Sequence, residues 1–347
     1  MNQRSRRSLA SKANQLREAL AFIATRKGRR RHIHQDSGES LIVDDFVSDK
    51  AKILQSKAFR VLKHKTQVFT FPDNPLVRDR QSHVLEVVAN ASVICNMLGL
   101  NAKLVDAISL GHDIGHGPFG HQGESWIAEA MGMPEFCHEK FGVILAQKIE
   151  RKGQGLNLTR ETLEGMMRHS GSLASAEMTP EAWVVRYADK FAYIFHDVND
   201  VIIRGGYPAS DELRELISYF GANQRERGTT VISALVVESA EKGRVSFEDS
   251  EVARKFGILR KKMLEIYPKV TRQDVGAALE PTLKFLTRLD IGDPFLLLAM
   301  MTDRDVDLVT HTTMHDLPLF NKLSVKEIAP YLADIGKVDM CDPDLSW

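Results

Sequence analysis

The chain has 347 residues, 43% of them hydrophobic and 27% charged, which is ordinary globular composition and enough for one large domain or a main domain with a smaller one. Its 46 Lys and Arg balance 46 Asp and Glu, so no global field would attract nucleic acid. Three widely spaced cysteines, Cys95, Cys137 and Cys341, argue against a disulfide framework or a zinc ribbon. We expect a cytoplasmic protein, because no apolar run approaches the roughly 20 residues that span a bilayer and the basic N-terminus lacks an apolar signal segment.

The first part of the chain is basic. Residues 1–34 hold ten Lys or Arg and one acid, Glu18. We interpret residues 1–43 as a basic N-terminal arm or helix, which is either a solvated tail or a contact surface for single-stranded nucleic acid or anionic effectors. No aromatic residues interleave its basic clusters, so stacking on bases is not indicated.

Helical patterns follow almost without interruption. Residues 82–100 place apolar side chains at helical spacing and close on a glycine, and residues 101–111 begin with an asparagine, which favours an N-cap. Residues 179–203 begin with Thr-Pro, a helix start. Residues 66–71 could form a short strand or hairpin arm. Further helices are predicted at 208–221, 228–242, 247–266, 271–289 and 323–335, so the fold class is all-α.

The stretch GHDIGHGPFGHQGE at residues 111–124 crowds three histidines, two acids and five glycines into fourteen positions. His112 and Asp113 are neighbours, which point about 100° apart on a helix, so both reach one ion only where the helix end is opened. The glycines and proline that follow supply that opening. His83 on the preceding helix and Asp189 on a later one are candidates for two further ligands. Two imidazoles and two carboxylates suit one divalent ion per chain, Mn, Mg, Fe, Co, Ni or Zn, with water or substrate oxygen at the open positions.

Two further helix faces support this site. Asp189, Tyr193 and Asp197 run i, i+4, i+8, so a predicted ligand, a ring and a second carboxylate line one groove. Arg80 precedes His83 by three residues and projects toward the same face. The alternatives are a core aromatic for Tyr193 and an exposed charge for Asp197.

The H…HD…D arrangement and HDIGHGPFGH resemble the HD superfamily of metal-dependent phosphohydrolases. Six motifs over about residues 45–205 narrow the resemblance to deoxynucleoside triphosphate triphosphohydrolases of the dGTPase type, in the family's order. They are SKAFRVLKHKTQVF (56–69), RDRQSHVLEV (78–87), GHDIGHGPFGHQGE (111–124), FCHEKFG (136–142), LEGMMRHS (163–170) and ADKFAYIFHDVND (188–200). The resemblance implies an HD-domain helical core at 44–205, with additional C-terminal helices at 206–347 that complete the pocket and make oligomer contacts.

The resemblance also implies an activity. Members hydrolyse deoxynucleoside triphosphates, dGTP or dNTPs generally, to a deoxynucleoside and inorganic triphosphate by attack of water at the α-phosphorus. His116 and Glu124 match the catalytic pair, with an imidazolium on His116 protonating the departing oxygen because a nearby anion raises the pKa of a histidine. His121 and His138 would bind the same phosphates or exchange protons with them; otherwise they are packing or supporting histidines. The matching metal ligands are His83, His112, Asp113 and Asp189.

Five residues match the substrate pocket of that family. Arg80 would contact the α-phosphate, where Arg suits bidentate binding. Lys65 and Gln67 resemble residues that approach the sugar and the phosphates, with Gln67 near the 3′-hydroxyl. Tyr193 would pack on the deoxyribose and leave little room for a 2′-hydroxyl. Asp197 would bond the 3′-hydroxyl.

The implied partners are a dNTP substrate and further copies of the chain in a homo-oligomer, a dimer-based tetramer or hexamer. An activating nucleotide or single-stranded DNA is a possible further partner, and no membrane association is expected. One alternative is another HD phosphohydrolase, acting on nucleotide monophosphates, cyclic dinucleotides or alarmones, in which His116, His121 and His138 build a second metal site. The other is a nucleotide-sensing or nucleic-acid-binding protein with weak catalysis. KTQVF and DKFAYIFHD favour the triphosphohydrolase, and intact ligands speak against the sensor.

Overall fold

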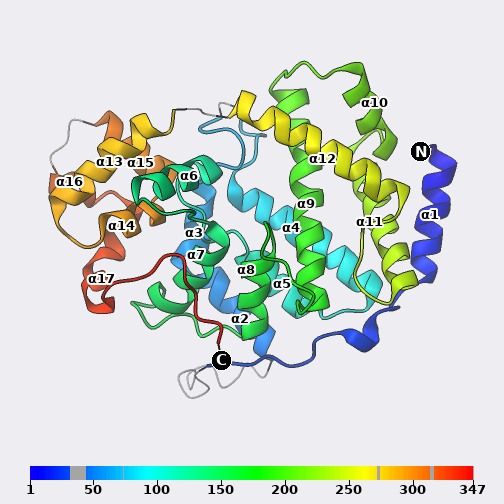
Figure 1. The fold of residues 1–347 in the computed structure, drawn as a ribbon, viewed down its shortest axis with the longest axis horizontal. Helices are drawn as coiled ribbons and strands as arrows, with labels where there is room; N and C mark the ends of the chain where they lie inside the picture. Colours follow the sequence, from blue (N-terminus) through cyan, green and yellow to red (C-terminus); the bar gives the residue numbers. More distant parts are fainter. Residues whose placement is uncertain (32–43, 73, 272–273, 313–315, 347) are drawn as a thin grey trace. The chain divides into compact units, whose positions relative to one another are not determined.

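The computed structural model describes residues 1–31, 44–72, 74–271, 274–312 and 316–346, and within these ranges the chain is all-α, as predicted (Figure 1). The predicted strand at 66–71 does not form; its pairing in these ranges is an isolated antiparallel bridge between Thr66 and Asp79. Pro72 follows directly and Pro75 three positions later, and proline cannot donate to a β-ladder. None of the described helices has the length and apolar character needed to cross a membrane.

Two compact units divide the chain, and each is assembled from three separate stretches. The first comprises Met1–Lys27, Leu85–Ser109 and Arg168–Thr271, and the second comprises Gly28–Val84, Leu110–Met167 and Arg272–Trp347. The two units are defined by contacts between residues and not by function. The predicted functional division into 1–43, 44–205 and 206–347 therefore stays a prediction.

The first unit is built around α9 and α11, which contact each other and α12 (Figure 1). Phe191 and Phe195 of α9 pack edge-on against Phe256 of α12, with ring centroids 5.2 and 5.7 Å apart. The predicted start of α9 is confirmed, because Thr179 caps it and Pro180 is its first residue. The helices are α1 (Gln3–Gln15), η1 (Ala21–Ile23), α4 (Arg80–Leu98) from Leu85 onward, α5 (Ala102–Gly111) up to Ser109, α9 (Pro180–Asp197), the π-helical η5 (Val198–Arg204), α10 (Asp211–Phe220), α11 (Gln224–Lys242) and α12 (Glu251–Val270).

The second unit consists of shorter helices. Among them α13 contacts α14, α15 and α16, and α17 contacts η4. The helices are α2 (Asp45–Gln55), α3 (Lys57–Arg60), η3 (Val61–His64), the first turn of α4, the end of α5, α6 (Gly120–Ala130), α7 (His138–Ile144), the π-helical η4 (Leu145–Ile149), α8 (Arg160–Arg168) up to Met167, α13 (Gly276–Leu289), α14 (Pro294–Met300), α15 (Asp303–His311), α16 (Asp316–Phe320), η6 (Ser324–Glu327) and α17 (Ala329–Ile335).

The described part of the basic arm is folded. Helix α1 packs against α11 in the first unit. In the second unit Arg30 pairs with the fully buried Asp49 at 2.8 Å, and Arg29 pairs with Glu161 at 2.8 Å. The interpretation as a solvated tail is therefore wrong for these residues, because acids far along the chain fix the arginines. Residues 32–43 of the predicted arm lie outside the described residues.

Candidate active site

Two histidines and an aspartate of the second unit converge on one point. His83 lies in the first turn of α4, and His112 and Asp113 directly follow Gly111, the last residue of α5. Their candidate ligand atoms all lie within 4.8 Å of one another, and the three residues are 1%, 1% and 3% exposed. The glycine-rich sequence predicts such an opened helix end, and the structure has it.

The charge state of Asp113 fits a metal ligand. Burial by itself would raise the pKa of this carboxyl, but the imidazoles of His112 and His116 and the Arg80 guanidinium hold it well below its usual range. The residue is therefore a carboxylate at neutral pH. Two imidazole nitrogens and a carboxylate oxygen, all buried and convergent, are a donor set that suits a divalent first-row ion.

Asp189, the fourth predicted ligand, belongs to the first unit. It lies on α9 and is 7% exposed. Its approach to His83, His112 and Asp113 stays a prediction.

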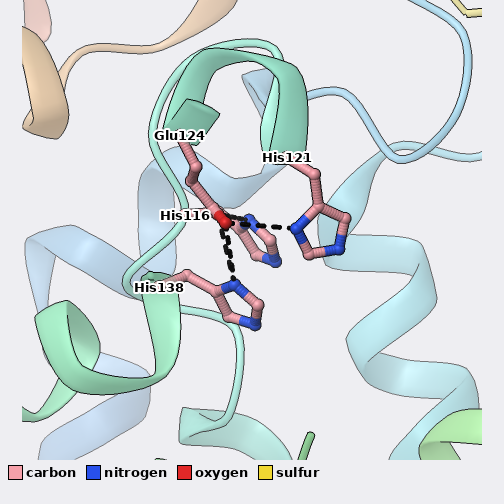
Figure 2. A group of neighbouring side chains, drawn as sticks. All are labelled: His116, His121, Glu124 and His138. Carbon is pink, nitrogen blue, oxygen red and sulfur yellow. Dashed lines mark hydrogen bonds and ion pairs between the residues drawn. The ribbon is translucent and has the colours of Figure 1, made fainter. Parts of the chain in front are cut away.

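A second cluster surrounds the carboxylate of Glu124, on which three imidazoles converge (Figure 2). Nδ1 of His116 lies 2.5 Å from Oε1 of Glu124, Nδ1 of His121 lies 3.1 Å from Oε2, and Nδ1 of His138 lies 3.2 Å from Oε1. His116 and His138 are buried with stacked rings 3.5 Å apart, whereas the side chain of His121 is 76% exposed. His116 also lies 3.4 Å from Asp113, so the two clusters adjoin. The structure thus brings all four predicted catalytic residues together.

The two stacked imidazoles differ in charge. Burial, followed by Arg80 and His138, lowers the pKa of His116 to about 3. Burial also acts to lower the pKa of His138, but Glu124 and Glu139 outweigh it and raise the pKa to about 9. Burial therefore favours the neutral form of His116, contrary to the imidazolium expected from a nearby anion, whereas the neighbouring carboxylates favour the charged form of His138.

Close backbone approach explains one of the glycines. A methyl group at Gly115 would lie 2.1 Å from the carbonyl oxygen of His138 and 2.3 Å from the amide nitrogen of Gly142. The loop before α6 therefore contacts the backbone of α7, which brings His138 beside His116. Phe119, next to the first residue of α6, has a φ of 62°, a conformation that non-glycine residues seldom adopt.

Arg80 projects toward this site as predicted, and its guanidinium already donates hydrogen bonds to other residues of the protein. Its Nη1 donates to Oδ2 of Asp113 at 2.7 Å, and its Nε and Nη2 donate to the carbonyl oxygen of Thr66 at 3.1 and 2.8 Å. A contact between this guanidinium and a phosphate stays a prediction.

Lys65 and Gln67 come from the segment between η3 and α4. Nζ of the buried Lys65 donates to the carbonyl oxygen of His116, and burial lowers the pKa of Lys65 to about 8. Oε1 of Gln67 is buried and accepts no hydrogen bond within the part of the chain that the structure describes. A buried acceptor of this kind fits a substrate hydroxyl.

Two residues of α12 that the sequence did not reveal contact the predicted sugar-binding face of α9. Nε of Arg260 donates to the Tyr193 hydroxyl at 2.7 Å, and the Tyr267 hydroxyl donates to Oδ2 of Asp197 at 2.6 Å. Burial raises the pKa of Tyr193 to about 12, so the phenol stays protonated. The i, i+7 spacing of Arg260 and Tyr267 on one helix face was the available signal. Tyr193 and Asp197 thus each have a hydrogen-bonding partner on α12 within the first unit.

Comparison with known proteins agrees with this geometry. Residues 80–199, which hold the two histidine-rich clusters and α9, match the family model of the HD domain. The chain contains an HD domain. The expected resemblance to the HD superfamily is confirmed, and the matched residues include His83, His112 and Asp113.

Curated relatives narrow the HD domain further. The chain is 37% identical over 222 residues to a deoxyguanosinetriphosphate triphosphohydrolase-like protein of Clostridium tetani, with 63% of this chain and 63% of the relative covered. Proteins of the same name from Clostridium perfringens (strain SM101) and Caldanaerobacter subterraneus are each 40% identical, over 223 and 203 residues, covering 62% and 58% of this chain. The match spans 59–65% of these three relatives' own length. The HD domain and these names support an HD-type nucleotide phosphohydrolase.

Proposed function

We propose that the chain hydrolyses deoxynucleoside triphosphates to a deoxynucleoside and inorganic triphosphate with a divalent metal ion. The observation that supports this most directly is the contact between two clusters, His83–His112–Asp113 and His116–Glu124–His138, within one buried region. A ligand set beside a proton-carrying imidazole pair is what hydrolysis of a phosphate ester with a poor leaving group requires.

The chemistry at the α-phosphorus sets the roles. An oxygen of water forms a bond to phosphorus, and the bond from phosphorus to the 5′-oxygen of the deoxynucleoside breaks. A divalent ion held by His83, His112, Asp113 and Asp189 would supply positive charge to this phosphate when bound. The departing 5′-oxygen is an alkoxide and requires a proton, and the attacking water releases one proton, so the overall reaction balances.

We assign that proton to the pair of stacked imidazoles, with His116 as the donor. The negative charge of a bound triphosphate raises the pKa of a neighbouring imidazole, which favours transfer of a proton from His138 to His116. Glu124 contacts Nδ1 of both rings and holds their orientation. His121 lies at the exposed edge of the cluster, where it would contact the terminal phosphates.

The remaining predicted residues would hold the substrate. Lys65 and Arg80 supply buried positive charge close to His116 and Asp113. Gln67 and Asp197 offer acceptors for the 3′-hydroxyl, and Tyr193 covers the sugar. We further propose a cytoplasmic homo-oligomer, a dimer-based tetramer or hexamer, for which an activating nucleotide or single-stranded DNA is a candidate effector; the names of the relatives support the nucleotide part of this proposal.

The decisive experiment is product analysis. The purified protein is incubated with each dNTP in the presence of Mn, Mg or Co, and the products are separated by anion-exchange chromatography. Deoxynucleoside with inorganic triphosphate supports the proposal. Deoxynucleoside monophosphate with pyrophosphate, or no turnover of any dNTP with any metal, contradicts it.

A second candidate function is an HD phosphohydrolase with two metal ions. It is favoured by one observation, namely that His116, His121, Glu124 and His138 also place ligand atoms within 4.8 Å of one another. Metal analysis of the purified chain separates the two candidates: one ion per chain supports the triphosphohydrolase, and two ions support the alternative.

The tyrosine of the sugar face provides a prediction about specificity. We expect dATP to be cleaved far faster than ATP, and we expect Tyr193→Ala to narrow that ratio because the ring no longer excludes a 2′-hydroxyl. Tyr193→Phe is the matched control, since it keeps the ring and loses only the hydrogen bond from Arg260. The ratio of kcat/KM for the two nucleotides is the measurement. Equal rates on dATP and ATP in the unmodified protein would contradict the assignment of Tyr193.

A further inference from the structure

A carboxylate from the C-terminal part of the chain binds two segments that carry predicted site residues. Asp303 is the first residue of α15 and is 2% exposed. Its Oδ2 accepts hydrogen bonds from the amide and the hydroxyl of Thr66, the first at 2.9 Å, and its Oδ1 accepts one from the amide of Phe119 at 2.8 Å. All these residues belong to the second unit.

The first of these segments contains the predicted sugar and phosphate contacts. Thr66 lies between Lys65 and Gln67, and its carbonyl oxygen accepts two hydrogen bonds from the guanidinium of Arg80. The amide of Arg80 in turn donates to the carbonyl oxygen of Lys65 at 3.1 Å. A shift of Thr66 would therefore move both predicted phosphate cations.

The second segment carries the catalytic cluster. Phe119 caps α6 in a left-handed conformation, and its side chain makes no capping hydrogen bond. His121 and Glu124 follow in the first turns of that helix, and His116 precedes Phe119 by three residues. The bond from the Phe119 amide to Asp303 offsets the strained backbone at this point, because a buried amide without an acceptor is costly.

We infer that Asp303 is a positioning residue for the reaction, an inference that rests on the proposed function. Within the described residues, Asp303 makes no hydrogen bond to the predicted metal ligands or to the Glu124 cluster; its hydrogen bonds go to Thr66 and Phe119. It fixes Thr66 relative to Phe119, and thereby the phosphate-binding cations relative to the imidazoles that carry the proton. A neighbouring cation, Lys65, complements its charge.

The test compares two carboxylates of the same helix. Asp303→Asn keeps the shape but turns an acceptor into a donor facing either Thr66 or Phe119. Asp305→Asn is the control, since Asp305 also accepts four hydrogen bonds, from the amides and hydroxyls of Thr302 and Ser324, yet binds neither segment. We expect Asp303→Asn to lower kcat/KM about 10–100-fold, by analogy with the loss of a group that orients a metal-ligating side chain. KM for the dNTP should rise in Asp303→Asn. A substitution that only lowers the fraction of folded protein would leave KM unchanged.

Amide hydrogen exchange measured by mass spectrometry tests the placement without any substrate. In Asp303→Asn the peptides covering 60–70 and 116–124 should exchange faster, and in Asp305→Asn they should exchange as in the unmodified protein. Equal exchange in these peptides, or kinetic constants for Asp303→Asn that match those of Asp305→Asn, would overturn the inference.

Two further comparisons keep the outcome interpretable. Thr66→Val removes only one of the three hydrogen bonds to Asp303, so it can be used if Asp303→Asn does not fold. Faster amide exchange in the peptide covering 60–70, together with a raised KM, supports the inference. Unchanged amide exchange and an unchanged KM oppose it. If the unmodified protein releases triphosphate from no dNTP, the proposed function fails, and the exchange comparison still decides the role of Asp303.

Discussion

Replacement of His116 by alanine should lower kcat by about 10²–10⁴-fold, the usual contribution of general acid catalysis. The departing 5′-oxygen would then leave without a positioned proton donor. The metal content should stay complete, because His83, His112 and Asp113 are separate side chains, and KM should change little. Steady-state kinetics and metal analysis on the same preparation are the measurements.

The partners of His116 make this result diagnostic. Glu124→Ala should cause a similar loss, and the His116→Ala/Glu124→Ala double variant should be little worse than either, since groups that act as one unit are not additive. His138→Ala should also reduce kcat, because Glu124 and Glu139 favour a charged imidazole at His138, beside the proposed donor. If His116→Ala retained a normal kcat while His138→Ala or His121→Ala did not, the donor would be that other imidazole. Loss of the ion in His116→Ala would place His116 among the ligands instead.

Removal of the Asp113 carboxylate should abolish both metal binding and turnover. Asp113 contributes a buried charge within 4.8 Å of the two imidazole ligand atoms, and the neighbouring His112 cannot replace it. Asp113→Asn is preferable to Asp113→Ala, because it fills the same volume beside the buried Arg80. Metal content by elemental analysis, with thermal denaturation to confirm folding, is the measurement.

The control for this experiment is Asp106→Ala, which removes a carboxylate of α5 that accepts a hydrogen bond from Ser92. It should keep one ion per chain and normal turnover. Full metal occupancy in a folded Asp113→Asn variant would contradict the assignment of this cluster as the metal site.

Local patterns in the sequence were sufficient to predict much of this molecule. Helices are periodic, so α4, α9, α10 and α11 could be predicted to within a few residues, and Thr179-Pro180 marked the start of α9. The crowding of His112, Asp113, His116 and Glu124 in one glycine-rich stretch indicated a site, because such residues seldom gather without a ligand. The structure brings these residues together as that pattern predicts.

The contributions of distant segments could not be predicted in the same way. Asp303 and Thr66 are 237 residues apart, and no local periodicity reports that they meet. In the sequence, Arg260 and Tyr267 are ordinary polar residues of a helix. Their hydrogen bonds to Tyr193 and Asp197 can be recognised only once the packing of α12 against α9 is known. The opposite pKa shifts of His116 and His138 depend on burial and on neighbouring carboxylates, neither of which a spacing of 22 positions reveals.

Gly115 has a consequence for how freely this sequence can vary. Gly115 does not have a positive φ, so no turn requires a glycine here. Glycine is required because the backbone of α7 lies too close for a side chain. Any side chain there would separate α7 from the loop and move His138 away from Glu124. Gly117, two positions on, has no neighbouring atom closer than 3.5 Å to the place of a methyl group. In a saturation-mutagenesis library selected for function, position 115 should accept glycine alone while position 117 accepts alanine, so two glycines of one motif would carry unequal mutational constraint.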